Sequence, residues 1–225
     1  SEMGSESLDK NQWKELSVRN TKGVYRLIEE LRRRHPEVEF EACASGGGRV
    51  DFGAMRYFDE YWPSDNTDAL DRLSIQESYS YLYPVKYMRA WLTDDFGMDR
   101  RKIPLQFSMY SAMCGSLGIG IDLNSTSDKK MEEIASYIKV YKEIRETVQF
   151  GDLYRLCSLK TDKIQAVQYV KDRESVVFIF LDHEQYGDAF HCVKLRGLEE
   201  NQVYQFELEG IQYEKTGAFL MNRGV

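Results

Sequence analysis

The chain has 225 residues, of which 42% are hydrophobic and 13% aromatic, a composition that can bury the core of one or two domains and that argues against disorder. Its formal net charge of −7 and pI near 5.2 argue against a nucleic-acid-binding protein, which would need a basic face. No apolar run reaches the roughly 18 residues of a membrane-spanning helix, and the polar, acidic segment 1–6 is unlike a signal peptide.

The cysteines and histidines are few and dispersed. No C-x-x-C pair occurs among the four cysteines, and the three histidines do not cluster. This pattern favours reduced thiols in a cytoplasmic protein over a disulfide framework or a zinc site. We therefore expect no metal centre. The residues concerned are Cys43, Cys114, Cys157, Cys192, His35, His183 and His191.

The first predicted elements are a helix and a strand. Apolar residues recur at helical spacing from Val24 to Leu31, and His35-Pro36 ends that segment. The alternation over 38–44 then predicts a strand. It leads into the triple glycine 46–48, where the backbone can approach a ligand closely and adopt a positive φ.

The next predicted elements continue the alternation of strand, loop and helix. A strand over 58–62 leads to Asp65, and the cluster 65–67 is suited to cap a helix whose inner face carries Leu70 and Leu73. Residues 103–109 are predicted as a further strand. A helix is predicted after Ser127, its expected N-cap, with apolar positions from Met131 to Tyr141.

This alternation predicts βα units with a parallel sheet. In a (β/α)₈ barrel the chemistry lies on loops at the carboxyl ends of the strands, and the loops that follow 38–44 and 58–62 occupy such positions. After about residue 150 the pattern changes. A strand is predicted over 174–181, half-exposed alternation follows over 204–209, and 196–201 is predicted as a hairpin turn. We therefore expect two domains, 1–150 and 151–225.

The two loops also suggest a kind of ligand. Asp65 and Asp68 lie beside Trp62, and a carboxylate next to an aromatic ring and a glycine-lined wall suits a polyhydroxylated substrate such as a sugar. Considered by chemistry alone, Asp65 is more often a helix cap than a catalytic group.

The same residues carry a family resemblance. The run from Glu41 to Asp51 and the pattern Ser64-Asp65-x-x-Asp68-x-x-x-Arg72 resemble the active-site signature of the microbial α-galactosidases of glycoside hydrolase family 36. The resemblance covers nearly the whole chain. Its further segments are 22–27, 103–109, 118–120, 141–145, 151–156 and 217–222.

The resemblance implies a fold. Residues 1–150 would form the second half of a catalytic (β/α)₈ TIM-type barrel with about four βα units, and residues 151–225 an incomplete antiparallel C-terminal β-sandwich domain. The family's nucleophile is an aspartate of a Lys-x-Asp type motif that would precede Ser1. We therefore expect a fragment of a longer enzyme, associated with its missing N-terminal half and poorly stable without it, and a homo-oligomeric parent.

The resemblance also implies roles for the site residues. Asp65 would be the general acid/base of a retaining glycosidase, with a pKa raised by the nucleophile's charge and by partial burial. Cys43, Ser45 and Gly46 would line the galactose subsite. The alternatives are a buried structural cysteine and a plain turn.

Five further residues complete the predicted site. Arg49 and Asp51 would brace the glycine loop, with sugar contact a less favoured alternative, and Trp62 would either stack on the sugar or pack in the wall. Asp68 and Arg72 would form an ion pair that holds the loop, worth about 0.3 to 0.5 kcal/mol if exposed. A direct catalytic role for Asp68 is the second choice.

The activity that the resemblance implies is hydrolysis of terminal α-linked galactose, as in melibiose or raffinose, without metal or organic cofactor. One alternative keeps the chemistry and changes the substrate or product: an α-N-acetylgalactosaminidase, or a galactosyl transferase of the raffinose-synthase type. Another is a non-catalytic sugar-binding fragment, because the chain lacks the nucleophile. The isolated fragment is expected to be inactive.

Overall fold

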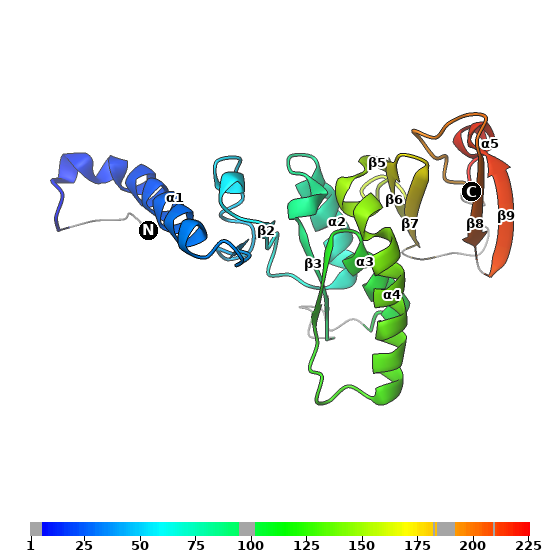
Figure 1. The fold of residues 1–225 in the computed structure, drawn as a ribbon, viewed down its shortest axis with the longest axis horizontal. Helices are drawn as coiled ribbons and strands as arrows, with labels where there is room; N and C mark the ends of the chain where they lie inside the picture. Colours follow the sequence, from blue (N-terminus) through cyan, green and yellow to red (C-terminus); the bar gives the residue numbers. More distant parts are fainter. Residues whose placement is uncertain (1–5, 95–101, 182, 184–191, 209) are drawn as a thin grey trace. The chain divides into compact units, whose positions relative to one another are not determined.

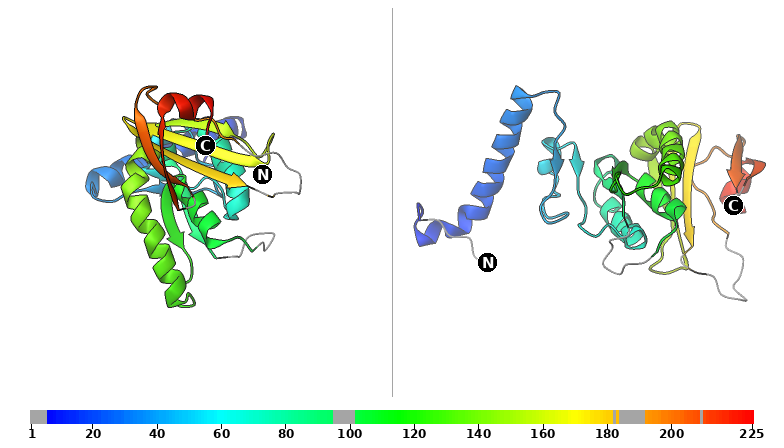
Figure 2. Two further views of the ribbon diagram at one scale, coloured as in Figure 1. Left: turned by 90° about the vertical axis from the view of Figure 1, so that its right-hand side faces the viewer. Right: turned by 90° about the horizontal axis from the view of Figure 1, so that it is seen from below.

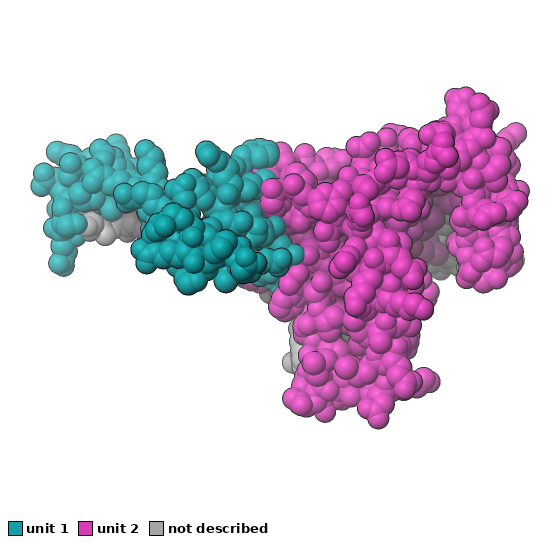
Figure 3. Space-filling view, in the orientation of Figure 1, with its two compact units in different colours: residues 1–62 teal, residues 63–225 magenta. Residues whose placement is uncertain are grey.

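The computed structural model describes residues 6–94, 102–181, 183, 192–208 and 210–225 (Figure 1). Packing divides the chain into two compact units, residues 1–62 and 63–225 (Figure 3). None of the helices in the described part is long and apolar enough to cross a membrane.

Unit 1–62 contains the first half of the predicted strand and helix succession. Its elements are η1 (Lys10–Glu15), α1 (Leu16–Arg34), β1 (Glu41–Ala42), η2 (Ala54–Arg56) and β2 (Glu60–Tyr61). The predicted helix is confirmed as part of α1, which ends before His35-Pro36 as expected. β1 and β2 lie within the two predicted strands but are shorter, and they pair in parallel.

One side of α1 is joined to the segment around β2 by aromatic and ionic contacts. Tyr25 stacks on Tyr57 with ring centroids 4.9 Å apart. The Arg32 guanidinium donates to both carboxylate oxygens of Asp59, at 2.5 and 3.1 Å, and the Phe40 N–H donates to the same carboxylate at 2.9 Å. Asp59 therefore joins α1, the approach to β1 and the approach to β2.

We expect Asp59 to make unit 1–62 sensitive to acid. Burial alone would raise the pKa of Asp59, but the hydrogen bonds from Arg32 and the Phe40 N–H outweigh it and hold the pKa below its usual value. This stabilisation is present above the unfolded-state pKa of about 3.9 and is lost as the pH falls through the folded-state pKa.

The check is urea unfolding of the wild type and an Asp59→Asn variant between pH 6 and pH 2. The wild type should lose more stability than the variant across this range, by less than about 1 kcal/mol because the pair is partly exposed. Equal acid dependence in the two proteins would contradict the assignment.

Unit 63–225 begins with helices around a second parallel pair. The elements are α2 (Ala69–Ser80), η3 (Val85–Tyr87), β3 (Arg89–Thr93), α3 (Leu105–Met113), β4 (Ser116–Gly120) and α4 (Asp128–Phe150). β3 pairs with β4 in parallel, as β1 does with β2, so the predicted parallel pairing of strands is confirmed. An α-helix, α3, separates β3 from β4, whereas only the short η2 lies between β1 and β2. The N-cap of α4 is Ser127, as predicted, and its hydroxyl accepts the Lys130 N–H.

The prediction of a strand over 103–109 is wrong. The segment enters α3 directly after Pro104, its N-cap. Ile103, Leu105, Phe107 and Met109 alternate with other residues, but such a short apolar run does not distinguish a strand from a helix. Met109, Ala112 and Met113 are buried, which is helical spacing.

A tryptophan lies across two glycines in the β3–β4 pair. Trp91 is the register partner of Gly118 in the neighbouring strand. A Cβ atom added at Gly118 or at Gly120 would come within 2.4 Å of the Trp91 indole. The glycines therefore leave the space that the flat ring occupies, and any side chain there would displace it.

The remaining strands are antiparallel. β5 (Asp152–Cys157), β6 (Ile164–Lys171) and β7 (Glu174–Leu181) form one sheet, and β8 (Val203–Leu208) pairs with β9 (Ile211–Thr216), which leads into α5 (Gly217–Asn222). β7 has the predicted bounds. The change from α4 to β5 falls at the predicted boundary near residue 150, but the division into domains 1–150 and 151–225 stays a prediction, because the packing units divide elsewhere.

The two faces of β6 contact different parts of unit 63–225, as expected for side chains that alternate along a strand. One face carries Tyr169 and lies toward α3 and α4 (Figure 2), where Phe107 and Tyr110 contact the rings of β7. The other face carries Ile164 and Ala166, which pack in a core with Leu195 and the helix residue Leu220.

The prediction of a hairpin turn at 196–201 is also wrong. The residues before it do not form a strand that pairs with β8; instead Val193 exchanges backbone hydrogen bonds with Val225, and the Leu195 N–H donates to Leu220 O. The buried Gln168 side chain holds the turn, because it accepts the Arg196 N–H at 2.8 Å and donates to Arg196 O at 2.9 Å. The Gln168 amide thus makes the backbone hydrogen bonds that a neighbouring strand would make in a hairpin.

Candidate functional site

The glycine loop that follows β1 is a tight turn. Ser45 has φ 49° and Gly46 has φ 73°, both in the left-handed region. The Ala44 N–H donates to Gly46 O at 3.1 Å, and a Cβ at Gly48 would lie 2.6 Å from Ala44 O. Glycine is thus favoured at Gly46 by conformation and required at Gly48 by space. Ser45 is a non-glycine residue in a strained conformation, a feature that clusters at binding sites.

The predicted sugar-binding residues surround this turn within unit 1–62. Cys43, Ser45 and Arg49 are exposed, Gly46 is buried and Trp62 is half-buried. The alternative of a buried structural cysteine is therefore wrong for Cys43, which is an exposed free thiol. The Trp62 N–H donates to Ala42 O at 3.0 Å and so extends the β1–β2 pair by one residue.

Asp51 hydrogen bonds within the segment that follows the glycine turn. Its Oδ1 accepts the Tyr25 hydroxyl at 2.7 Å and the Ala54 N–H at 2.8 Å. Burial, followed by the hydrogen bond and the charge of Asp51, raises the pKa of Tyr25 to about 12. A Cβ at Gly53 would lie 2.8 Å from the Tyr25 hydroxyl, so the turn closes tightly over this contact. Sequence reasoning anticipated bracing by Asp51 but not Tyr25 as its partner.

The segment that carries Asp65 is held by its neighbours. The Ser64 hydroxyl accepts the Asn66 N–H at 3.1 Å, and Asn66 Oδ1 accepts the Asp68 N–H at 3.0 Å. The Asn66 amide also donates to Asp71 in the first turn of α2 at 2.8 Å. The loop is therefore fixed on both sides of Asp65.

The helix cap is one residue beyond the predicted cluster 65–67. Asp68 is the N-cap of α2, and its Oδ1 accepts the N–H groups of Leu70 and Asp71, both at 3.0 Å. The alternative that Asp65 is merely a helix cap is thus wrong. Asp65 is exposed, in contrast to the predicted partial burial, because the chain turns inward only at the buried Asp68.

Arg72 braces the loop from inside the fold. It is only 2% exposed, and its guanidinium donates to Arg89 O at 2.5 Å, Ser64 O at 3.5 Å and Gln76 Oε1 at 3.3 Å. Burial lowers the pKa of Arg72 to about 10. Its hydrogen bonds thus join α2 to the residue before Asp65 and to the start of β3. The predicted Asp68–Arg72 ion pair stays a prediction.

Two further features of the described residues concern metal ligands and a cavity in unit 63–225. Among the described residues, no three His, Cys, Asp or Glu side chains are grouped so that they could hold a metal ion. A cavity between α2 and the sheet β5–β7 has a volume of about 30 Å³, room for about two water molecules and far too small for a hexose.

Comparison with known proteins identifies the family. The Melibiase family model matches residues 1–151, and the model of the glycosyl hydrolase family 36 C-terminal domain matches residues 164–225. The chain belongs to glycoside hydrolase family 36. The first of these matches contains the glycine loop and the Asp65 loop, so the predicted resemblance is confirmed.

The relatives are longer than the chain. Alpha-galactosidase AgaA of Geobacillus stearothermophilus is 33% identical over 227 residues, which covers 100% of this chain and 31% of the relative. The solved alpha-galactosidase from Lactobacillus brevis has a TM-score of 0.91 at 32% identity, covering 99% of this chain and 30% of that one. A variant of AgaA in complex with raffinose gives the same TM-score and identity, with 99% and 31% covered. The family 36 chain thus spans less than a third of these relatives.

Proposed function

We propose that this chain carries the general acid/base, Asp65, of a retaining alpha-galactosidase. The observation that carries the proposal is the position of Asp65 in the loop 64–68, whose neighbouring residues fix the turn and cap the helix. Asp68 caps the helix and Asn66 ties the turn, so the exposed Asp65 carboxyl is held between two fixed neighbours. Membership in family 36 supports the same assignment.

In this mechanism the Asp65 carboxylic acid donates its proton to the glycosidic oxygen while a second carboxylate attacks the anomeric carbon. The Asp65 carboxylate then takes a proton from the water that cleaves the galactosyl-enzyme intermediate. Such a pair requires carboxyl groups about 5 to 5.5 Å apart.

The nucleophile is proposed to belong to a longer parent enzyme that contains this chain. In that enzyme, residues 1–150 would be the second half of a (β/α)₈ barrel, and residues 151–225 the main part of a C-terminal β-sandwich. The two parallel strand pairs and the two antiparallel sheets support this assignment. We further propose that the parent enzyme is a homo-oligomer and that it is cytoplasmic, the second part in keeping with the four free thiols.

The proposed substrate is an oligosaccharide with a terminal α-linked galactose. The family includes alpha-galactosidase structures in complex with raffinose and with stachyose. Cys43, Ser45 and Gly46 would line the galactose subsite, where the exposed positions of the strained turn can approach ring hydroxyls. Arg49 and Trp62 would complete its wall.

The test is an assay of the parent enzyme with nitrophenyl α-galactoside and with raffinose. We expect galactose release with retention of the anomeric configuration, followed by proton NMR, and no turnover of nitrophenyl α-N-acetylgalactosaminide. The isolated chain should release no galactose, because one of the two paired carboxylates is missing. Turnover by the isolated chain, or an inverted product, would refute the proposal.

A further inference from the structure

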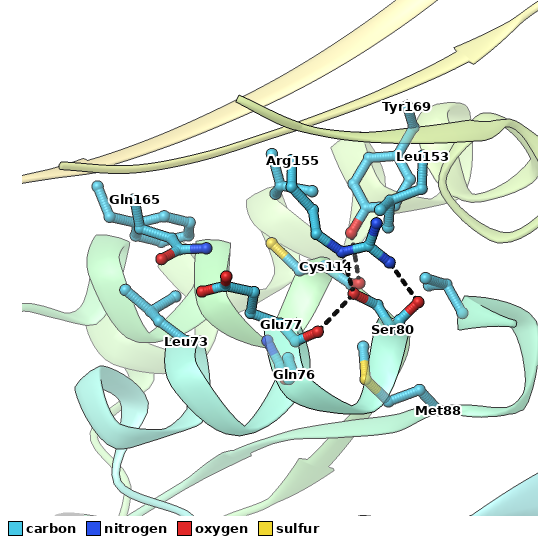
Figure 4. Close-up of a pocket in the computed structure, with 13 residues that line it drawn as sticks. Leu73, Gln76, Glu77, Ser80, Met88, Cys114, Leu153, Arg155, Gln165 and Tyr169 are labelled. Carbon is cyan, nitrogen blue, oxygen red and sulfur yellow. Dashed lines mark hydrogen bonds between the residues drawn. The ribbon is translucent and has the colours of Figure 1, made fainter. Parts of the chain in front are cut away.

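The last turn of α2 accepts hydrogen bonds from residues of β5 and of the turn that follows β5. The Arg155 guanidinium donates from Nε to Ser80 Oγ at 2.9 Å and from Nη2 to Ser80 O (Figure 4). The Ser158 hydroxyl donates to Glu77 Oε2 at 2.7 Å, and the other Glu77 oxygen accepts the Tyr81 hydroxyl at 2.9 Å. We call these four contacts the α2 clasp.

The α2 clasp supplies hydrogen-bond donors and a positive charge at the C-terminal end of α2. The last carbonyls of an α-helix have no partner within it and carry partial negative charge, so a cation that donates to them is favourable. Arg155 supplies that cation at Ser80 O, and its guanidinium also lies 4.3 Å from the centroid of the Tyr81 ring. Glu77, only 6% exposed, obtains the hydroxyl donors that a buried carboxylate needs.

Hydrogen bonds hold the last turn of α2 beside a small cavity. The cavity of about 30 Å³ lies beside the α2 clasp and is lined by Glu77, Ser80, Arg155 and Gln165 together with apolar residues of the sheet (Figure 4). A gap of this size removes van der Waals contacts on one side of the helix. Loss of the Arg155 contacts would therefore remove the restraint at the C-terminal end of α2, while Arg72 and Gln76 still join its middle to β3 and α3.

The opposite end of the same helix carries the Asp65 loop. Asp68 caps it, Asn66 donates to Asp71, and Arg72 donates to Ser64 O. The helix has 12 residues and thus a length of about 18 Å. Because a helix of three turns moves as a stiff rod, a shift at Ser80 is transmitted to the loop.

We propose that Arg155 is a positioning residue for the general acid/base: it fixes the axial position of α2 and thereby the place of the Asp65 carboxyl. This inference rests on the proposed function of Asp65. It gives the β5–β7 sheet a part in proton transfer, although none of its residues contacts the substrate in this account.

The first experiment compares hydrogen exchange in Arg155→Met and Arg173→Met variants of the parent enzyme by mass spectrometry. Arg173 is an exposed residue of the turn between β6 and β7, so its replacement makes the same charge change on the same sheet. Peptides covering 64–72 should exchange about tenfold faster in Arg155→Met, and at the wild-type rate in Arg173→Met. Faster exchange limited to residues near 80 would overturn the proposal.

The second experiment measures kcat/KM against the leaving group. A misplaced acid slows substrates with a poor leaving group, such as raffinose, and hardly affects dinitrophenyl α-galactoside, whose departure needs no proton. We expect Arg155→Met to lower kcat/KM for raffinose about ten- to a hundredfold, and to move the basic limb of its pH profile. Arg155→Lys should restore part of this loss. Equal losses for both substrates would indicate a merely structural role.

A milder variant covers the case in which Arg155→Met fails to fold. Ser158→Ala removes one hydrogen bond of the α2 clasp and should give the same pattern with a smaller amplitude, about two- to fivefold for raffinose. Failure of this inference is distinct from failure of the proposed function. An active wild type that depends on Asp65, with Arg155 and Ser158 variants indistinguishable from Arg173→Met, would refute the positioning role alone.

Discussion

Replacement of Asp65 by asparagine should lower kcat/KM of the parent enzyme for raffinose by about 10²- to 10⁴-fold, the usual contribution of a general acid/base. The asparagine side chain has nearly the same shape and cannot transfer the proton. Because Asp65 is exposed and the N-cap is Asp68, the substitution should leave the unfolding free energy within about 0.5 kcal/mol of the wild type. Initial rates with raffinose and with dinitrophenyl α-galactoside check the effect, which should be much smaller for the second substrate.

Asp68→Asn is the matched control for that experiment. Asparagine caps helices as well as aspartate does, so α2 should keep its N-terminus. If Asp68 only caps the helix, kcat/KM should stay within about threefold of the wild type. A large loss of kcat/KM in Asp68→Asn together with a small loss in Asp65→Asn would reverse the assignment. Asp68 would then have the direct catalytic role that the sequence offered as the alternative.

Replacement of Arg72 by methionine should cost about 3 kcal/mol of unfolding free energy in the parent enzyme. Methionine keeps the apolar stem of the buried side chain but removes the donors to Arg89 O, Ser64 O and Gln76 Oε1. Each buried acceptor left without a donor costs about 1 to 3 kcal/mol. Urea unfolding, with the slope checked against the wild type, measures the change.

Two comparisons define this second prediction. Arg72→Lys should lie between methionine and the wild type, because one ammonium group cannot reproduce the planar array of donors. Arg173→Met, an exposed substitution, should change the unfolding free energy by less than about 0.5 kcal/mol. An Arg72→Met enzyme as stable as Arg173→Met would show that the buried guanidinium does not hold the loop.

The sequence predicts best those elements whose signals are local. α4 combines an N-cap serine with apolar residues at helical spacing, and β7 is a continuous run of strand-forming residues, so both were found with few errors. The local signal is ambiguous in the segment 103–109, because four alternating apolar residues suit either a strand or a helix. Its tertiary surroundings, in which α3 packs against β3, β4 and the rings of β7, decide the outcome.

The contacts that could not be predicted join residues far apart in the chain. Arg155 and Ser80 are separated by 75 positions, and Tyr25 and Asp51 by 26. Nothing in the local pattern around Ser80 marks it as the acceptor of a guanidinium. The cap position was missed for a different reason: Asp65, Asn66, Thr67 and Asp68 are all good caps, and only the hydrogen bonds show that Asp68 has that role.

The way Trp91 lies over Gly118 and Gly120 restricts how this part of the molecule can change during evolution. Either glycine can acquire a side chain only after the indole has been replaced by something smaller, since a Cβ at either position would overlap the ring. The three positions should therefore vary as a set among descendants of this gene, and the order of substitutions should matter. A lineage that keeps the tryptophan inherits the two glycines with it.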